Sequence, residues 1–293
     1  MTQTLVPIEG AVPPAPLRRG EPGVTVLEPT GGWRALSVAE LWRFRDLMRA
    51  LVLRDVKLRY RQTLLGVAWV VILPLFSAGV LTFVFGSVAK LPSGGVPYFL
   101  IPLAGNVGWS FYSGVLSRGS GSLTGNAALV SKVFFPRALL PVSTIGSAAV
   151  DMVVSLALAV GLAATQGIYP HAGLLMAPVW LLLGLAVAFG PVLVLAGAMA
   201  VFRDVGYILP IALQALLYLS PVAYQLSAVP GHYRSLYELN PFTAPIEGLR
   251  KAILGVGHVP AESVVSSLVC AVVLLVCGAI YFRRHEQRFA DVI

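Results

Sequence analysis

Charged residues are scarce in this 293-residue chain, and reactive residue types are scarcer still. Only 12% of the residues are charged and 57% are hydrophobic, which is more apolar surface than a water-soluble core needs. The two cysteines and four histidines form no HExxH motif and no cluster with metal-ligand spacing. No glycine is followed by lysine, so the phosphate-binding loop GxxxxGKS/T is absent. These absences argue against metal chemistry, direct ATP binding and catalysis by this chain.

Long apolar runs, by contrast, are plentiful, and they lack the alternation of barrel strands. A bilayer offers no water to backbone groups, so such runs must cross it as helices, and the expected fold class is all-α. Six runs are candidates for transmembrane helices. They cover residues 66–88, 98–116, 141–165, 174–201, 205–224 and 264–282. The fourth run has 28 residues, which predicts a tilted helix or one broken near Pro191.

Basic residues set the expected orientation. Ten of the 21 lysines and arginines precede Gly66, and the cytoplasmic segments of membrane proteins retain such residues. With six spans, 17 basic residues fall on the cytoplasmic side, and outside fall only Lys90, Arg234, Arg250 and Lys251. We therefore expect a multi-pass protein of the cytoplasmic membrane with both termini in the cytosol. Its net charge of +8 requires no nucleic-acid partner.

The segments before and after the spans have different expected roles. Residues 1–36 are rich in proline and predict a disordered tail, and residues 283–293 predict a short cytoplasmic tail. Residues 37–60 predict an amphipathic helix in the cytoplasmic interface, ahead of a membrane domain over residues 61–282. This helix either anchors the chain to anionic lipid or docks a partner.

Two loops are longer than a connection between helices needs. Residues Gly125 to Arg137 predict a short helix ended by Pro136, which either touches a partner or lies on lipid headgroups. Residues Gln225 to Glu262 predict two amphipathic helices broken at Asn240-Pro241. The apolar faces of these two helices are buried either in the outer leaflet or against the outer end of the protein.

Polar and aromatic residues within the spans are candidates for function. Asp151 is an acid deep in a predicted span, where a charge is costly. It either joins a polar network with Ser147, Ser155 or another helix, or lies nearer the cytoplasmic end. Aromatic rings suit a glycan passage because sugar rings stack on them, although an interfacial aromatic belt explains each one singly. The aromatic candidates for cargo contact are Trp69, Phe76, Phe83, Tyr207, Tyr218 and Tyr224.

Four stretches of the chain resemble a known family in their order and spacing. They are RYRQTLLGVAWVVILPL from Arg59, VSKVFFPRALLPV from Val130, FRDVGYILP from Phe202 with LYLSPVAY from Leu217, and LNPFTAPIEGLRKAIL from Leu239. Together they resemble the ABC-2 type permeases that export polysaccharides, the Wzm/TarG-like group. The resemblance runs from about Ser37 to the end of the chain.

The resemblance implies the type V ABC exporter fold, with six spans, a homodimer and a channel at the dimer interface. It also implies a separate ABC ATPase subunit in two copies, which binds ATP and magnesium, so that this chain carries no cofactor and no catalytic residue. The residues expected to couple to the ATPase are Leu41, Phe44, Arg45, Met48, Lys132, Phe134, Phe135, Arg203 and Asp204. Re-entrant helices are expected to form an external gate with Tyr233, Tyr237, Asn240 and Phe242.

The cargo implied by the resemblance is a polysaccharide on a polyprenyl lipid carrier, such as an O-antigen, a teichoic acid or a cell-wall galactan. Arginine far outnumbers lysine, which is typical of a GC-rich, actinobacterial coding sequence and favours the galactan precursor. One alternative is a drug or lipid exporter of the same superfamily. A second is an ion-coupled transporter, for which Asp151 would be the sole ionisable group. A third, a membrane-embedded transferase, lacks its acidic motif.

Overall fold

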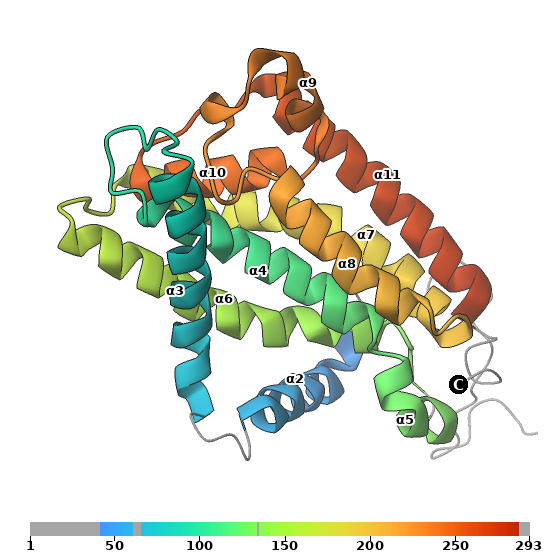
Figure 1. Cartoon of the computed structure of the whole chain (residues 1–293). Helices are drawn as coiled ribbons and strands as arrows, with labels where there is room; N and C mark the ends of the chain where they lie inside the picture. The colour runs from blue at the N-terminus through green and yellow to red at the C-terminus, as the bar shows by residue number, and fades with distance from the viewer. Residues whose placement is uncertain (1–41, 61–65, 134, 287–293) are drawn as a thin grey trace, which may run out of the picture.

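The computed structural model describes residues 42–60, 66–133 and 135–286. Every regular element in these ranges is helical, which confirms the all-α class, and Figure 1 shows the long helices packed side by side. The elements in chain order are α2 (Arg45–Tyr60), η2 (Gly66–Ala68), α3 (Trp69–Leu81), η3 (Thr82–Val88), α4 (Leu100–Ser120), η4 (Thr124–Asn126), α5 (Ala127–Lys132), α6 (Leu139–Thr165), η5 (Ala172–Met176), α7 (Ala177–Val201), α8 (Val205–Leu219), η6 (Leu226–Ala228), α9 (Gly231–Leu239), α10 (Thr243–Leu254) and α11 (Ala261–His285).

Four helical segments of the described chain are long and apolar enough to cross a membrane. They are Trp69–Val88, Leu139–Thr165, Ala172–Val201 and Ala261–His285, and they coincide with the first, third, fourth and sixth predicted spans. The second and fifth predicted spans are helical in α4 and α8, but α8 has only 15 residues and rises about 22 Å. A total of six crossing helices therefore remains a prediction.

The fourth and fifth spans differ in detail from expectation. The helix α7 continues through Pro191 without interruption, so the predicted break is absent there. The helix α8, in contrast, ends before the predicted limit at residue 224. Ser220 has an extended backbone (φ −109°, ψ 148°) and Pro221 follows. A residue before proline avoids the helical conformation, so the chain leaves the helix and continues as a buried segment, which we call the 220–226 segment.

The shorter helices largely follow the predicted pattern. The helix α2 covers residues 45–60 of the predicted interface helix, whose first residues, 37–41, lie outside the described ranges. The helix α5 confirms a short helix in the first long loop, but it ends at Lys132 because Val133 is extended, and not at Pro136. The helices α9 and α10 meet at Asn240-Pro241 as predicted. The helix α10 is buried at every position except Lys251, so protein covers its apolar surface.

The main core lies between α4, α6, α7 and α10, and α11 packs along α7. Small residues allow α7 and α11 to pack closely. A Cβ added to Gly278 would lie 2.3 Å from the carbonyl oxygen of Gly190, so neither helix leaves room for a side chain there. Such small-residue contacts are typical of packed membrane helices.

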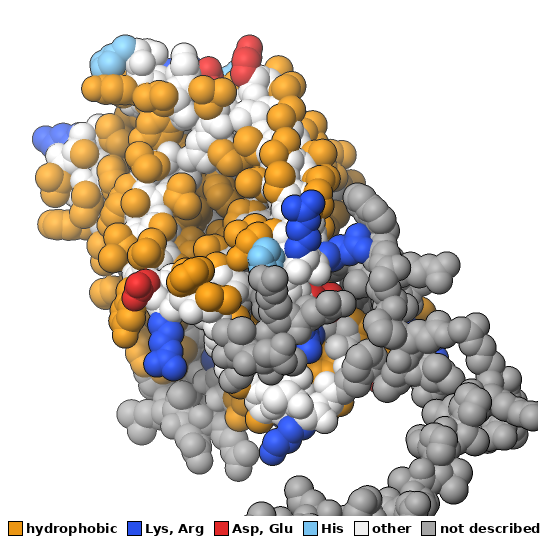
Figure 2. Space-filling view, turned by 90° about the vertical axis from the view of Figure 1, so that its right-hand side faces the viewer, with side chains coloured by type: hydrophobic (Ala, Val, Ile, Leu, Met, Phe, Trp, Pro, Cys, Tyr) orange, Lys and Arg blue, Asp and Glu red, His pale blue; other side chains and the backbone are white. Residues whose placement is uncertain are grey.

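Two ends of the bundle serve as landmarks below. The α2 end carries α2, α5 and the α7–α8 turn, and the α9 end carries α9 and the loop before α4 (Figure 1). The backbone N–H of Arg137 donates to the carboxylate of Glu286 at 3.2 Å, so the last helix finishes close to the start of α6. Figure 2 shows a broad hydrophobic face between the two ends, with most of the charged side chains at its borders. This surface pattern is that of a membrane protein.

Candidate functional site

A pocket of about 730 Å³ opens at the α9 end and brings together tyrosines that are far apart in the sequence. Its walls come from the end of η3, the last turn of α8, the 220–226 segment and α9. We call it the tyrosine pocket after Tyr218, Tyr224, Tyr233 and Tyr237, which all line it. The other lining residues are Phe85, Leu91, Leu216, Leu219, Ala228, Val229, Pro230, Leu236 and Asn240. None of the residues that line it is charged.

The early end of α8 creates this pocket. Tyr218 occupies the last turn of the helix, and the turn at Ser220-Pro221 then sends the chain back, so that Tyr224 returns toward it. The hydroxyl of Tyr224 donates to the carbonyl oxygen of Tyr218 at 2.7 Å. This bond satisfies a carbonyl that the ended helix leaves without an intrahelical partner.

A second contact joins α9 to the same wall. The hydroxyls of Tyr224 and Tyr237 lie 2.9 Å apart, and their rings meet edge to face at 6.1 Å. A phenol has one O–H, and that of Tyr224 is used on the carbonyl of Tyr218, so Tyr237 must be the donor between the two hydroxyls. The ring of Phe85 also packs on the ring of Tyr224, with their centres 5.6 Å apart. Tyr224 is therefore fixed, while Tyr218 and Tyr233 remain exposed.

Asn240 fastens the turn between α9 and α10 to the end of α8. Its side-chain amide donates to the carbonyl of Leu219 at 2.9 Å and to the hydroxyl of Ser220 at 3.0 Å. Its side-chain oxygen accepts from the backbone N–H of Phe242 at 2.9 Å. The ring of Phe242 points away from the pocket and packs in the core on Trp109 and Tyr112. The structure thus brings three of the four predicted gate residues together and places Phe242 elsewhere.

The predicted cargo-contacting residues divide in the same way. Tyr218 and Tyr224 line the pocket, whereas Trp69, Phe76, Phe83 and Tyr207 lie outside it. The first three are spaced by seven residues and are exposed along α3 and its continuation η3, and Tyr207 is exposed on α8. Figure 1 shows α3 and α8 crossing in front of other helices of the bundle. The aromatic surface of these two helices is therefore open.

The residues predicted to couple to an ATPase lie at the α2 end, and they also fall into two groups. Phe135 is buried with Leu51, and Phe44 and Met48 pack against the same cluster, so these side chains hold α2 on the bundle. The charged members of the set are all exposed: Arg45, Lys132, Arg203 and Asp204. The predicted contacts Leu41 and Phe134 lie outside the described residues. Only the charged group is free of the core and open to another protein.

Asp151 forms a network with other helices, which is one of the two alternatives that the sequence left open. Its carboxylate pairs with Arg59 at the end of α2 and with Arg118 of α4, the latter at 3.1 Å. The hydroxyl of Ser147 donates instead to the carbonyl of Thr144, within its own helix. The acid therefore connects α2, α4 and α6.

The charge count assigned Arg250 to the outer side of the membrane, and the structure adds that both Arg250 and Glu247 are completely buried in α10. Sequence reasoning gave Glu247 no role. The available signal was an acid and a base three residues apart in a short, largely apolar helix, a spacing that allows a pair on one helix face. The hydrogen-bond partners that compensate for burying this ion pair come from segments distant in the sequence, so a local pattern does not predict them.

Comparison with known proteins identifies the family. The profile described as ABC-2 type transporter matches residues 46–254. The chain belongs to the ABC-2 type transporter family. The match includes the described helices from α2 to α10, and therefore the tyrosine pocket, Asp151 and the buried Glu247–Arg250 pair of this ABC-2 chain.

Individual relatives match this ABC-2 chain along most of its length. The O-antigen export system permease protein RfbA of Myxococcus xanthus is 29% identical over 259 residues, which cover 87% of this chain and 98% of the relative. A protein of the same name from Klebsiella pneumoniae is 22% identical over 249 residues, covering 85% and 95%. The polysialic acid transport protein KpsM of Escherichia coli is 25% identical over 250 residues, covering 82% and 93%.

Proposed function

We propose that this chain is the membrane subunit of an ATP-driven exporter that moves a lipid-linked polysaccharide across the cytoplasmic membrane. Membership of the ABC-2 family supports the transporter class. The names of the relatives, which concern O-antigen export and polysialic acid transport, support a polysaccharide as cargo. The sequence has no phosphate-binding loop, so ATP and magnesium are assigned to a separate ABC ATPase subunit and this chain is a non-catalytic transport subunit.

The tyrosine pocket carries the assignment of the cargo. Sugar rings present apolar C–H faces that pack on aromatic rings, while their hydroxyls can bond to the polar tips of tyrosine. Two of the pocket's rings, Tyr218 and Tyr233, are exposed and can receive such a ring, and the other two form a fixed wall behind them. The absence of charge among the residues that line the pocket favours a neutral glycan, such as a galactan, over an ion.

The rest of the molecule fits a channel formed by two copies. In this proposal α3 and α8 line the passage, which would give the exposed aromatic residues on their faces a function. The helices α4 and α8 complete the six spans, with the 220–226 segment extending α8 toward the outer surface. The basic α2 end faces the cytosol, as the retention of lysine and arginine on that side favours. There Arg45, Lys132, Arg203 and Asp204 contact the ATPase.

The proposal is tested by export from vesicles that contain the chain and its ATPase. Tyr218→Ala and Tyr233→Ala should each lower glycan export about two- to tenfold, which corresponds to the loss of one aromatic contact of about 0.5–1.5 kcal/mol. Tyr169→Ala, at an exposed tyrosine outside the pocket, is the matched control and should leave export unchanged. Complex assembly and basal ATP hydrolysis should stay the same in all three. Equal export by the three variants would remove the pocket from the transport path.

A second candidate is favoured by one specific observation, because most residues that line the pocket are apolar. Such a pocket also suits a small amphiphile, as in a drug or lipid exporter of the same family. Export of an amphiphilic dye with the same dependence on Tyr218 and Tyr233, without export of glycan, would select this alternative. An ion-coupled transporter is less well supported, because Asp151 is paired with two arginines. Transport without ATP would favour it.

A further inference from the structure

Two ionised side chains are completely buried in α10, within a chain that carries little charge. Glu247 and Arg250 both have 0% of their side-chain surface exposed, and their closest oxygen and nitrogen atoms lie 2.7 Å apart. Taking an ion pair out of water is costly unless further hydrogen bonds compensate for the lost hydration. The other contacts of this pair therefore indicate what the pair is for.

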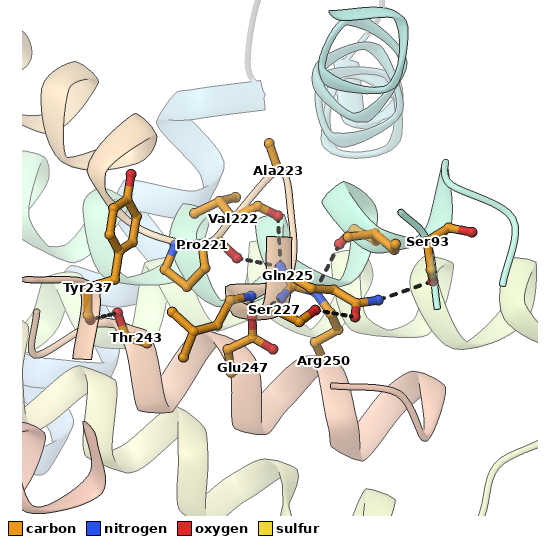
Figure 3. Close-up of polar contacts among 12 residues, drawn as sticks. Ser93, Pro221, Val222, Ala223, Gln225, Ser227, Tyr237, Thr243, Glu247 and Arg250 are labelled. Atoms are coloured by element: carbon orange, nitrogen blue, oxygen red, sulfur yellow. Dashed lines mark hydrogen bonds and ion pairs between the residues drawn. The ribbon is translucent and has the colours of Figure 1, made fainter. Parts of the chain in front are cut away.

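Those contacts go mainly to the 220–226 segment (Figure 3). The guanidinium of Arg250 donates to the backbone carbonyl oxygen of Pro221 and to that of Val222, the latter at 2.9 Å. The carboxylate of Glu247 accepts from the backbone N–H of Leu226 at 2.6 Å. One ion pair thus holds both ends of the segment, with carbonyl oxygens at the arginine end and an amide at the glutamate end.

The 220–226 segment needs such partners because it is buried and lies between two helical elements. Backbone groups in a buried irregular segment must find hydrogen-bond partners outside regular structure. Gln225 supplies one more anchor, since its side-chain amide donates to the carbonyl of Ser93 at 3.1 Å. The segment also lies directly on α4. A Cβ on Gly105 would be 2.3 Å from the carbonyl oxygen of Val222 and 2.9 Å from the guanidinium of Arg250.

The segment carries one wall of the tyrosine pocket. Tyr224 lies between the two anchored ends, two residues after Val222 and two before Leu226. Its ring and hydroxyl meet Phe85, Tyr237 and the carbonyl of Tyr218. A shift of the segment would move Tyr224 away from all three contacts at once. The ion pair itself is absent from the pocket lining, and its hydrogen bonds to the segment connect it to the pocket.

We propose that Glu247 and Arg250 are positioning residues that hold the 220–226 segment, and with it Tyr224, in place to form the tyrosine pocket. Their role in transport rests on the proposed function of that pocket, whereas their hold on the segment does not. The arrangement has a direction. The cation must lie at the carbonyls of Pro221 and Val222, and the anion must lie at the amide of Leu226, so the two charges cannot exchange positions.

Hydrogen exchange of the full chain in lipid nanodiscs, together with its ATPase, measures the hold on the segment directly. Glu247→Met should raise the exchange rate of the Leu226 amide about ten- to hundredfold, the ratio that corresponds to losing a hydrogen bond to a charged group. Glu247→Gln keeps an acceptor oxygen and should restore much of the protection. Leu249→Ala removes a buried side chain from the same helix without touching the segment's hydrogen bonds, and it should leave the Leu226 amide protected. Unchanged exchange in Glu247→Met would overturn the proposal.

The reversed pair, Glu247→Arg with Arg250→Glu, separates positioning from simple charge pairing. If opposite charge were all that mattered, the reversed pair would behave like the natural one. In the reversed pair we expect the Leu226 amide to exchange as fast as it does in Glu247→Met. An arginine cannot accept a hydrogen bond from an amide, and a carboxylate cannot donate one to the carbonyls. Protection restored to the natural level would contradict the directional role.

Export assays then test whether anchoring the 220–226 segment affects transport. Tyr224→Ala and Glu247→Met should both raise the glycan concentration needed for half-maximal export, with complex assembly unchanged. Glu247→Gln, which keeps an acceptor oxygen, should stay closer to the natural chain. If Tyr224→Ala weakens export and Glu247→Met, despite its faster exchange at Leu226, does not, the positioning role is refuted. If the exchange results are as expected and neither Tyr224→Ala nor Glu247→Met affects glycan export, the proposed function fails and the hold on the segment stands.

Discussion

Replacing Asp151 by asparagine tests the one acid that links three helices. The carboxylate pairs with Arg59 and Arg118, and the structure places it where α2 and α4 meet α6. Asparagine has nearly the same shape, so packing is retained while the negative charge shared by the two guanidinium groups is lost. The expected effect is electrostatic and can be bounded from the burial of the three side chains.

The exposure of Asp151, Arg59 and Arg118 decides how much the free energy of unfolding should fall. Exposed ion pairs contribute about 0–1 kcal/mol, whereas breaking a fully buried pair costs about 3–5 kcal/mol. The side chain of Asp151 is 29% exposed, and those of Arg59 and Arg118 are 27% and 30% exposed. These values lie between the two limits, so solvent screens part of the interaction. We expect Asp151→Asn to lower the free energy of unfolding by about 1–3 kcal/mol.

Equilibrium unfolding of the purified chain by titration with a denaturing detergent measures this change. The matched control is Asp46→Asn, because Asp46 is 81% exposed and its contact with Arg49 is 3.8 Å long. The control should change stability by less than about 0.5 kcal/mol. Adding Arg118→Gln to Asp151→Asn should recover part of the loss, since it removes one of the two like charges. The reasoning is refuted if Asp151→Asn is as stable as Asp46→Asn, or if the double variant is less stable than the single one.

Two further predictions concern helix packing and the pocket wall. Gly278→Ala should destabilise the chain, because the added Cβ would lie 2.3 Å from a backbone oxygen of α7. Its control is Gly161→Ala in α6, whose Cβ meets nothing within 4 Å and which should raise the free energy of unfolding by up to about 1 kcal/mol. Thermal unfolding in detergent compares the stability of the two variants. Tyr224→Phe removes the hydroxyl that joins Tyr218 to Tyr237 and should cost about 1–2 kcal/mol, measured in the same way, with Tyr169→Phe as the neutral control.

The sequence predicts well those elements whose cause is local. Apolar runs long enough to span a bilayer mark α3, α6, α7 and α11, because a helix in lipid must carry apolar side chains along its whole length. The break between α9 and α10 follows from Asn240-Pro241, since the residue before a proline is biased toward an extended backbone, and Asn240 is extended. The end of α8 had the same kind of signal in Ser220-Pro221. Because the apolar run continues to residue 224, the predicted span included Ser220-Pro221 instead of ending there.

Features that depend on contacts between distant segments cannot be predicted from a local sequence pattern. The residue types of the pocket could be chosen, because tyrosines suit a sugar, but their grouping depends on how the 220–226 segment returns along α8. Phe242 shows the limit of such a choice, since the family resemblance implied a gate role for it and its ring lies in the core. Arg250 looks like any surface cation until the carbonyls of Pro221 and Val222 are placed beside it.

The helix α4 explains why hydropathy alone does not identify every element of this bundle. It has 21 residues, enough for about 31 Å, yet it is not among the four segments with the hydropathy of a span. Its neighbours bury most of its side chains, so it does not have to be apolar on its outer surface. It can therefore carry the charged residue Arg118. Near one end, Arg118 meets Asp151, and near the other the carbonyl of Ile101 accepts from Arg250. The least hydrophobic long helix is thus the one that connects the network at the α2 end with the anchors of the tyrosine pocket.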